Sequence, residues 1–124
     1  MDNATKKILL VDDDRRNIFA LNAVLKAHGY RCETAASAVE GIEKLNQDEE
    51  IGLVLMDMMM PEMDGYEAIA SIRNNQKTAG IPIIAVTAQA MVGDKERCLA
   101  AGANGYISKP VNVDLLTKLL TAHL

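Results

Sequence analysis

The sequence predicts an α/β protein in which five parallel strands form one doubly wound sheet and five helices cover its two faces. Short apolar runs alternate with segments whose apolar residues recur every three or four positions. The central runs are apolar throughout, which is typical of strands buried on both faces of a parallel sheet. Strand and helix alternate five times, so right-handed crossovers predict the strand order 2-1-3-4-5.

Five segments are the strand candidates. The three central ones are the apolar runs at 8–11, 53–56 and 83–86. The segment 30–36 alternates apolar and polar residues, as expected of an edge strand. The segment 105–108 has weak strand propensity, but its place in the alternation predicts the fifth strand.

Four helices are predicted from apolar spacing, and capping residues mark where three of them begin. The spaced residues are Ile18, Leu21 and Leu25; Val39, Ile42 and Leu45; Ile69 and Ile72; and Leu116, Leu119 and Leu120. Ser37 with Glu40 and Asp64 with Glu67 have the spacing of capping boxes, and Asn112 is a candidate cap for the last helix.

The fourth helix is the least amphipathic of the five and is expected over about residues 93–101. Four glycines, Gly29, Gly52, Gly80 and Gly102, are predicted to mark helix ends and turns. The chain contains no internal repeat and no low-complexity segment. We therefore expect residues 1–124 to form a single domain, of a size that needs no disulfide or metal to fold.

Composition excludes several classes of function. With 13 Lys and Arg against 17 Asp and Glu, the net charge of −4 provides no overall positive field for nucleic acid. No apolar run approaches the ~18 residues that span a membrane. The two cysteines, Cys32 and Cys98, and the lack of a basic and then apolar leader favour the cytoplasm over secretion. An enzyme, a small-ligand module and a protein-binding module remain, without direct contact to nucleic acid or membrane.

Polar residues follow the central strands where each of them ends. Asp12 and Asp13 follow the first strand, Asp57 the third, Thr87 the fourth and Lys109 the fifth. In doubly wound sheets a ligand binds beyond the carboxyl ends of the strands, where the strand order reverses. Three carboxylates and one ammonium leave a charge of −2 there, which a divalent cation would neutralise. Because the set contains no His or Cys, Mg²⁺ fits better than zinc.

Four stretches of the chain carry a resemblance to a known family: ILLVDDDRRN, LVLMDMMMPEMDGYEAI, IPIIAVTAQAM and AGANGYISKPV. They resemble the CheY-like receiver domain of two-component response regulators, and they are most similar to the receivers of hybrid histidine kinases. The resemblance covers essentially the whole chain. It implies that residues 1–124 form one receiver domain with the flavodoxin-like version of the predicted fold.

The resemblance implies how the residues at the strand ends act. Asp57 would accept a phosphoryl group from a phosphohistidine. Asp12, Asp13, Asp57 and the backbone carbonyl of Met59 would bind Mg²⁺ as the cofactor.

Three further residues receive roles from the same resemblance. Thr87 and Lys109 would contact the phosphoryl oxygens. Thr87 and Tyr106 would form the switch, in which Tyr106 turns inward and partners detect the change on the fourth helix, fifth strand and fifth helix. A cis peptide bond between Lys109 and Pro110 is also implied.

In this family the lifetime of the phosphoryl group depends on the residues two beyond the acceptor and two beyond the threonine, here Met59 and Gln89. Hydrolysis needs a water aligned with the bond from Asp57 to phosphorus. Met59 offers no hydrogen bond to hold such a water, and Gln89 would orient one only partly. Both residues are therefore expected to tune dephosphorylation.

The implied partners are a histidine kinase, a histidine phosphotransfer protein, or both. The chain would be a monomer or a weak dimer through the fourth helix, fifth strand and fifth helix, and it would be a phosphoacceptor rather than an enzyme. The sequence is compatible with a stand-alone regulator and with a receiver that belongs to a hybrid kinase.

Two other functions share parts of this pattern. A Mg²⁺-dependent phosphohydrolase with an aspartyl-phosphate intermediate needs a second acid two residues after the nucleophile, where this chain has Met59. A flavodoxin-like module that binds FMN would need a first loop that cradles phosphate, whereas the acids at 12–14 would repel it. Both are poorer fits than a receiver.

The remaining candidates for chemistry have ordinary structural explanations. His28 is expected to end the first helix, where a cation is favourable, and His123 is expected to be a frayed terminal residue. Met56 is expected in the core, and four other methionines are expected to flank the loop after the third strand: Met58, Met59, Met60 and Met63.

Overall fold

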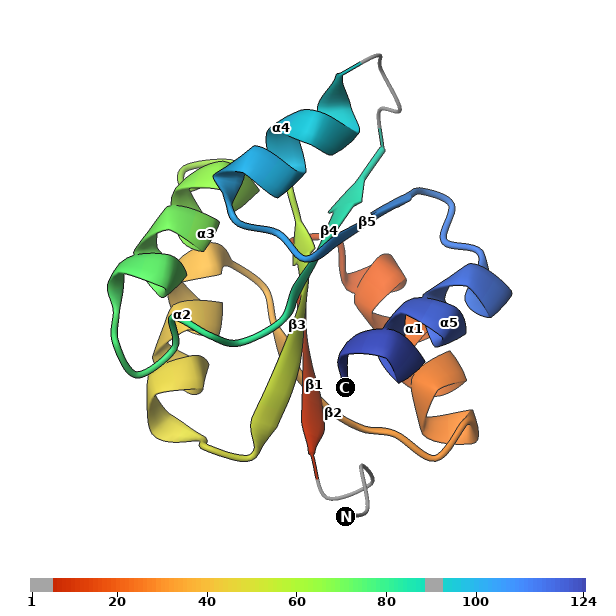
Figure 1. The fold of residues 1–124 in the computed structure, drawn as a ribbon. Helices are drawn as coiled ribbons and strands as arrows, with labels where there is room; N and C mark the ends of the chain where they lie inside the picture. The colour runs from red at the N-terminus through yellow and green to blue at the C-terminus, as the bar shows by residue number, and fades with distance from the viewer. Residues whose placement is uncertain (1–5, 89–92) are drawn as a thin grey trace.

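The computed structural model describes residues 6–88 and 93–124, in which strands and helices alternate along the chain (Figure 1). The strands are β1 (Lys7–Val11), β2 (Arg31–Ala35), β3 (Ile51–Asp57), β4 (Ile83–Thr87) and β5 (Gly105–Ser108). The helices are α1 (Arg15–Ala27), α2 (Ala38–Gln47), α3 (Gly65–Asn74), α4 (Asp94–Ala101) and α5 (Val113–His123). Every predicted strand and helix is confirmed.

The strands form one parallel sheet in the order β2-β1-β3-β4-β5, as predicted. Helices α1 and α5 cover one face, and α2, α3 and α4 cover the other (Figure 1). The order reverses at β1, where Val11 lies opposite Ala35 of β2 and Met56 of β3. The residues that follow β1 and β3 therefore emerge side by side at one edge of the sheet.

The core has two layers, one on each face of the sheet. Leu9 belongs to the layer under α2, α3 and α4, and Leu10 to the layer under α1 and α5. Both side chains are at most 1% exposed. Adjacent residues of one strand are thus buried on opposite faces, which explains why the central strands are apolar at every position.

The predicted caps are present, with one difference in detail. Asp64 and Glu67 form a complete capping box at the start of α3. Ser37 accepts a hydrogen bond from the Glu40 amide, but the Glu40 carboxylate accepts from the amide of residue 36 instead of the Ser37 amide. Asn112 caps α5 by accepting from the amide of residue 115. These bonds satisfy backbone donors that a helix leaves unpaired at its start.

One glycine prediction is wrong. Gly29 and Gly102 have the left-handed conformation expected at helix ends, and Gly80 lies in the turn before β4. Gly52, in contrast, is the second residue of β3. A Cβ atom there would lie 3.1 Å from both Leu124 Cδ1 and Lys6 Cβ, so close approach of the two chain ends accounts for the glycine.

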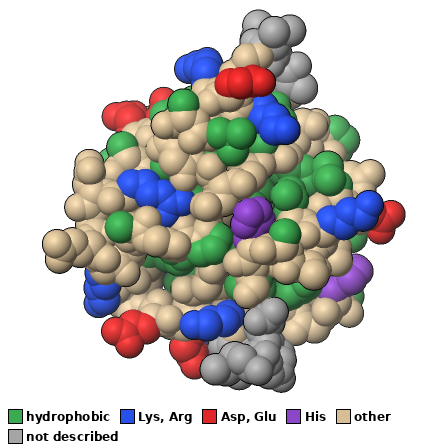
Figure 2. Space-filling view, viewed as in Figure 1, with side chains coloured by type: hydrophobic (Ala, Val, Ile, Leu, Met, Phe, Trp, Pro, Cys, Tyr) green, Lys and Arg blue, Asp and Glu red, His purple; other side chains and the backbone are tan. Residues whose placement is uncertain are grey.

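The surface agrees with the charge balance of the sequence. On the face shown in Figure 2, basic side chains are scattered among acidic ones and form no single patch. Within residues 6–88 and 93–124, the structure contains no helix with the length and hydrophobicity needed to cross a membrane.

Candidate functional site

Three carboxylates meet at the carboxyl ends of β1 and β3. One oxygen each from Asp12, Asp13 and Asp57 lies within 4.8 Å of the others. Asp12 and Asp57 are buried, at 6% and 3% exposure, whereas Asp13 is exposed. In the described part of the chain, no other cluster of three such side chains has this geometry. The predicted convergence of the acidic residues is confirmed.

Backbone amides fix the two buried carboxylates. Asp12 Oδ1 accepts a hydrogen bond of 2.9 Å from the Asp14 amide, and Asp57 Oδ1 accepts one of 3.0 Å from the Met59 amide. Each carboxylate thus closes a turn onto the amide two residues further on. The Asp14 side chain in turn caps α1. These turns hold both carboxylates at the edge of the sheet.

Lys109 completes the charged cluster. Its Nζ lies 3.3 Å from Asp12 Oδ2 and 3.4 Å from Asp57 Oδ2. The cis Lys109–Pro110 bond implied by the resemblance is present, and the Lys109 amide donates to the Thr87 carbonyl at 2.7 Å. Burial alone would lower the pKa of Lys109, but the attraction of Asp57 and Asp12 outweighs burial and raises it. Lys109 therefore stays positively charged beside the carboxylates.

Asp57 has the most perturbed carboxylate of the site. Burial raises its pKa from 3.8 to about 6. The Met59 amide and the charge of Lys109 act in the opposite direction, and repulsion from Asp12 adds to the effect of burial. Near neutral pH a cation in the cluster would favour the deprotonated carboxylate, the form that acts as a nucleophile.

The structure describes three of the other predicted site residues: Thr87, Met59 and Tyr106. Thr87 ends β4, is 4% exposed, and lines a cavity of about 520 Å³ together with residues 58–60 and Tyr66. Met59 has a side chain that is 55% exposed. Tyr106 lies on β5, half-buried against the core layer under α4. Gln89 lies outside the described residues.

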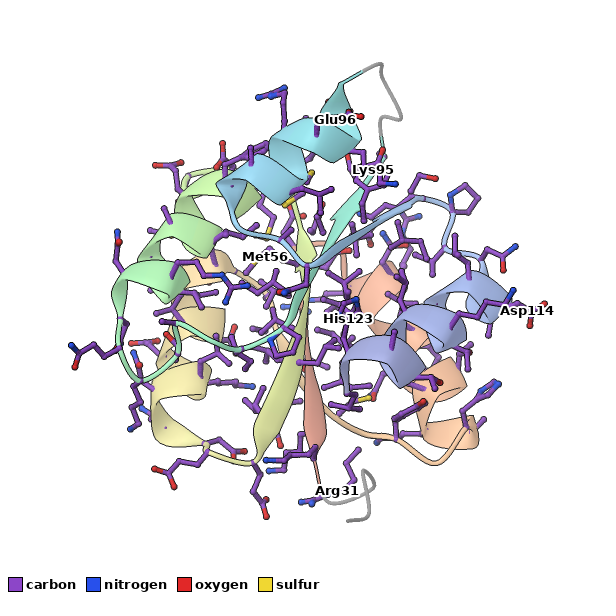
Figure 3. All side chains as sticks on the ribbon, viewed as in Figure 1. Arg31, Met56, Lys95, Glu96, Asp114 and His123 are labelled. Carbon is purple, nitrogen blue, oxygen red and sulfur yellow. The ribbon has the colours of Figure 1, made fainter. Side chains whose placement is uncertain are left out.

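Two of the methionines after β3 are more buried than the sequence indicated. Met56 is fully buried on β3, as expected (Figure 3). Met58 and Met60, expected beside the loop, are also buried, at 1% and 7% exposure. The chain folds back after β3 so tightly that a Cβ on Gly65 would lie 2.5 Å from Met58 Sδ. Packing under α3 therefore explains these two side chains.

Neither histidine belongs to the site. His28 is the C-cap of α1, and its Nδ1 lies 2.9 Å from the Val24 carbonyl. His123 lies on the last turn of α5 (Figure 3), with Nε2 near Gly105 at the amino end of β5. The carboxylates lie at the opposite ends of the strands. The placement of His28 at the end of the first helix is confirmed. His123, expected to be frayed, is instead the last residue of α5 and is half-buried.

A groove that was not predicted from the sequence lies between α1 and the segment after Lys109. It has a volume of about 240 Å³ and is lined by Asn17, Ala20, Leu21, Val24, Lys109, Pro110, Val111 and Val113. Asn17 donates to Asp12 Oδ2 at 3.4 Å, so the groove adjoins the acidic cluster. Four of these residues, at positions 17, 20, 21 and 24, lie on one face of α1. Only Leu21 among them belongs to the apolar spacing from which this helix was predicted.

Comparisons with known proteins agree with this geometry. Residues 8–121 match the family described as "Response regulator receiver domain". The chain is similar to the sensor histidine kinase RcsC of Escherichia coli K12, with 39% identity over 122 residues. That alignment covers 98% of this chain but only 12% of the kinase.

Solved structures of receiver domains are also similar to this chain. The chain is similar to the receiver domain of the sensor histidine kinase PA1611 from Pseudomonas aeruginosa PAO1, a structure with a magnesium ion coordinated in the active site cleft. The identity is 36%, the TM-score is 0.87, and 97% of this chain and 98% of that one are covered.

A third similarity is to a co-crystal structure of the Saccharomyces cerevisiae histidine phosphotransfer signaling protein Ypd1 and the receiver domain of its downstream response regulator Ssk1. The identity is 28%, the TM-score is 0.88, and 97% of this chain and 89% of that one are covered. With a family match over most of its length and an acidic cluster where the strand order reverses, the chain belongs to the response regulator receiver domains, which are signalling phosphoacceptors and not conventional enzymes.

Proposed function

We propose that this chain accepts a phosphoryl group on Asp57 from a phosphohistidine, with Mg²⁺ bound by the acidic cluster. The supporting observation is the environment of Asp57. Its carboxylate ends a rigid, buried strand, lies within 4.8 Å of two further carboxylates, and is 3.4 Å from an ammonium group. The Asp57 side chain is only 3% exposed, and the end of a buried strand fixes the position of its reactive carboxylate.

The donor atoms of the cluster suit Mg²⁺. Asp12, Asp13, Asp57 and the Met59 backbone carbonyl would supply only oxygen ligands, which a hard divalent cation prefers. The bound ion would neutralise charge on the oxygens of the transferring phosphoryl group. The exposed Asp13 gives the ion a route of entry from solvent.

The transfer replaces one bond to phosphorus by another. An Asp57 carboxylate oxygen forms the new bond while the bond from phosphorus to the donor's histidine nitrogen breaks, and the nitrogen leaves with the electron pair. Lys109, 3.4 Å from Asp57 Oδ2, holds a phosphoryl oxygen during the transfer. The Thr87 hydroxyl, at the end of the neighbouring strand, donates to another.

The acyl phosphate then adds about −2 of charge beside Thr87. A new hydrogen bond from Thr87 would draw the end of β4 toward residue 57. Tyr106 lies on the adjacent strand, in register with Ala85 of β4, and is half-buried. In the proposed switch Tyr106 turns inward, and partners detect the change on α4, β5 and α5.

The donor is proposed to be a histidine kinase or a histidine phosphotransfer protein that docks on α1. Phe19 on α1 is 78% exposed, which is unusual for a large aromatic side chain and favours a partner contact. The groove beside α1 ends at Lys109, next to Asp57. A helix seated there would present its histidine to the carboxylate. The co-crystal structure with Ypd1 supports this class of partner.

We also propose that residues 1–124 act as one receiver domain in the cytoplasm. Cys32 and Cys98 are both free thiols, as expected in a reducing compartment.

Intact mass spectrometry after treatment with a small phosphodonor tests the function. The wild-type chain should gain one phosphoryl group with Mg²⁺ and none with a chelator, and Asp57→Asn should gain none. Asp114→Asn is the matched control, because Asp114 projects into solvent at the start of α5 (Figure 3). An adduct at full level in Asp57→Asn would show that another residue is the acceptor.

A further inference from the structure

Arg73, on the last turn of α3, binds backbone and side-chain oxygens of two loops. Its Nε and Nη2 donate to the Gly102 carbonyl at 3.0 and 2.7 Å. Its Nη1 donates to the carbonyls of Ala79 and Ile81, and Nη2 also donates to Asn104 Oδ1. These acceptors are neutral, so the guanidinium is held by carbonyl groups and not by an acid.

The Gly102 carbonyl belongs to the C-terminal end of α4. Gly102 is the C-cap of this helix, and the last turn of α4 contains no basic residue. Carbonyls at a helix C-terminus lack partners within the helix and carry partial negative charge. Arg73, which belongs to α3, supplies the positive charge that the last turn of α4 lacks. A Cβ on Gly102 would lie 3.2 Å from Arg73 Cγ, so the two residues are in close contact.

The loop that follows α4 is also joined to the sheet. The Asn104 amide donates to the Ile83 carbonyl at 2.7 Å, and the Ile83 amide donates to Asn104 Oδ1 at 2.9 Å. Asn104 Oδ1 therefore accepts hydrogen bonds from both β4 and Arg73. The end of α4 is held to a helix and to a strand at once.

At the N-terminal end of α4, the contacts seen among the described residues are of a different kind. Gly93, its N-cap, has φ 90° and provides no side-chain hydrogen bond, and Cys98 is the only buried residue of the helix. Arg97 stacks on the Tyr66 ring at 4.9 Å, but its side chain is 68% exposed. In Figure 1 this end of α4 projects beyond the end of β4.

The cavity beside Thr87 lies under the same end of the helix. Asp94, Arg97 and Tyr66 line it together with Thr87. The cavity gives the first turns of α4 room to move close to the phosphorylation site. Charge-assisted hydrogen bonds at the other end are stronger than an exposed cation–π contact.

We propose that Arg73 is a positioning residue that fixes the C-terminal end of α4, so that phosphorylation displaces the N-terminal half of the helix about this fixed end. The inference rests on the proposed phosphorylation of Asp57. It assigns Arg73, which has no contact with the acidic cluster among the described residues, a role in shaping the output surface.

Amide NMR spectra of the wild-type chain with Mg²⁺, recorded with and without beryllofluoride, test the displacement. Beryllofluoride mimics the phosphoryl group on an aspartate. We expect large shifts at the amides of residues 94–97 and small ones at 102–104. Shifts of equal size along the whole helix, or larger ones at 102–104, would overturn the inference.

Amide exchange in Arg73→Lys, without beryllofluoride, tests the fixed end separately. Lysine keeps the charge but loses the planar fork of donors. The amides of Gly102 and Ala103 donate to the carbonyls of Leu99 and Cys98, and their exchange should become about tenfold faster. The exchange rate of the Arg97 amide should not change. Arg31→Lys on β2 is the matched control and should change none of these rates. In Arg73→Lys, beryllofluoride shifts should spread to 102–104.

Two results distinguish a failure of this inference from a failure of the proposed function. If beryllofluoride changes nothing at the Met59 amide of the wild-type chain, the proposed phosphorylation of Asp57 is wrong, whatever Arg73 does. If beryllofluoride binds but Arg73→Lys leaves both the exchange at Gly102 and the pattern of shifts unchanged, the role assigned to Arg73 is wrong.

Discussion

The charge of Lys109 is expected to favour binding of the phosphoryl group and to oppose binding of the metal ion. Its ammonium lies about equally far from Asp12 and Asp57, at 3.3 and 3.4 Å. The same positive charge that would hold phosphoryl oxygens repels a cation in the cluster. Binding of metal and binding of phosphoryl should therefore respond in opposite ways when this charge is removed.

Lys109→Ala should retain Mg²⁺ binding, with affinity equal to or above that of the wild-type chain, because the carboxylates lose their counter-charge. Phosphorylation by a small donor should slow by about tenfold or more, equivalent to at least ~1.4 kcal/mol of barrier. Calorimetric Mg²⁺ titration and mass spectrometry measure the two effects. Loss of Mg²⁺ binding would mean that Lys109 serves to organise the carboxylates.

The raised pKa of Asp57 predicts how pH acts on the site. Because burial raises this pKa from 3.8 to about 6, the folded chain holds the proton more tightly than the unfolded chain. The Asp57 contribution to the free energy of unfolding is therefore largest below pH 3.8 and is lost as pH rises through about 6. Bound Mg²⁺ competes with that proton and offsets the cost of the charged carboxylate.

The increase in melting temperature caused by Mg²⁺ should accordingly be largest above pH 6 and decline as the pH falls below it. Thermal unfolding with and without Mg²⁺, from about pH 5 to pH 8, measures this. In Asp57→Asn the increase should be smaller and lose this pH dependence. An Mg²⁺ effect in the wild-type chain that stays constant down to about pH 5 would contradict the assignment.

Met59 is expected to set the lifetime of the phosphoryl group. Its thioether, 55% exposed beside Asp57, offers no strong hydrogen bond to an attacking water. Met59→Asn or Met59→Glu should accelerate phosphate release, and Gln89→Leu should slow it, by about one to two decades, or ~1.4 to 2.8 kcal/mol. Release of phosphate from the purified phosphoprotein with Mg²⁺ is the measurement. An unchanged half-life in the Met59 variants would favour a partner phosphatase or back-transfer to a histidine.

The turn from β3 into α3 depends on close packing of Gly65 against Met58, next to Asp57. Gly65 begins α3, and a Cβ there would lie 2.5 Å from Met58 Sδ and 2.6 Å from Met58 Cα. The second contact is with backbone, so a rotamer change of Met58 cannot relieve it. This glycine allows the chain to double back directly after Asp57.

Gly65→Ala should lower the free energy of unfolding by about 2–4 kcal/mol and weaken beryllofluoride binding, because the loop that supplies the Met59 carbonyl must shift. Gly80→Ala is the control, since a Cβ at Gly80 meets no atom within 4 Å and its φ is not positive. Urea denaturation compares the two variants. Equal stability of both would contradict this account of the turn.

At the scale of elements, the sequence was most informative where burial is complete. The central strands are buried on both faces, so their apolar runs predicted them directly. Gly52 was misplaced because a glycine that permits close approach looks the same in sequence as one that permits a turn. Met58 and Met60 were expected beside the loop, but their burial was not predicted because the reversal of the chain after Asp57 decides it.

Contacts between distant segments could not be predicted from one sequence. Arg73 and Gly102 are separated by 29 positions, and nothing in the local pattern around either residue indicates the other. Asn17 follows Asp12 by five positions, a spacing at which the loop before α1 decides whether the side chains meet. The residues at the strand ends, in contrast, converge because the topology requires it.

For the molecule as a whole, the residues of the proposed mechanism gather at one end of the sheet. Lys6 and Leu124 lie beside Gly52 at the start of β3. The acidic cluster lies at the carboxyl ends of the strands, and the groove beside α1 includes Lys109, which follows β5. The first turn of α4 lies at the same end of the sheet (Figure 1). In the proposed mechanism, the surface that receives the phosphoryl group and the surface that partners detect therefore share one end of the sheet. The weak dimer through α4, β5 and α5 stays a prediction.

The most direct test of the central claim is to locate the phosphoryl group chemically. The wild-type chain is phosphorylated by a small donor with Mg²⁺, the acyl phosphate is reduced with borohydride, and peptides are sequenced by mass spectrometry. We predict that homoserine appears at position 57 alone. Homoserine at position 12 or 13, or Mg²⁺-dependent phosphorylation that leaves position 57 unreduced, would contradict the account.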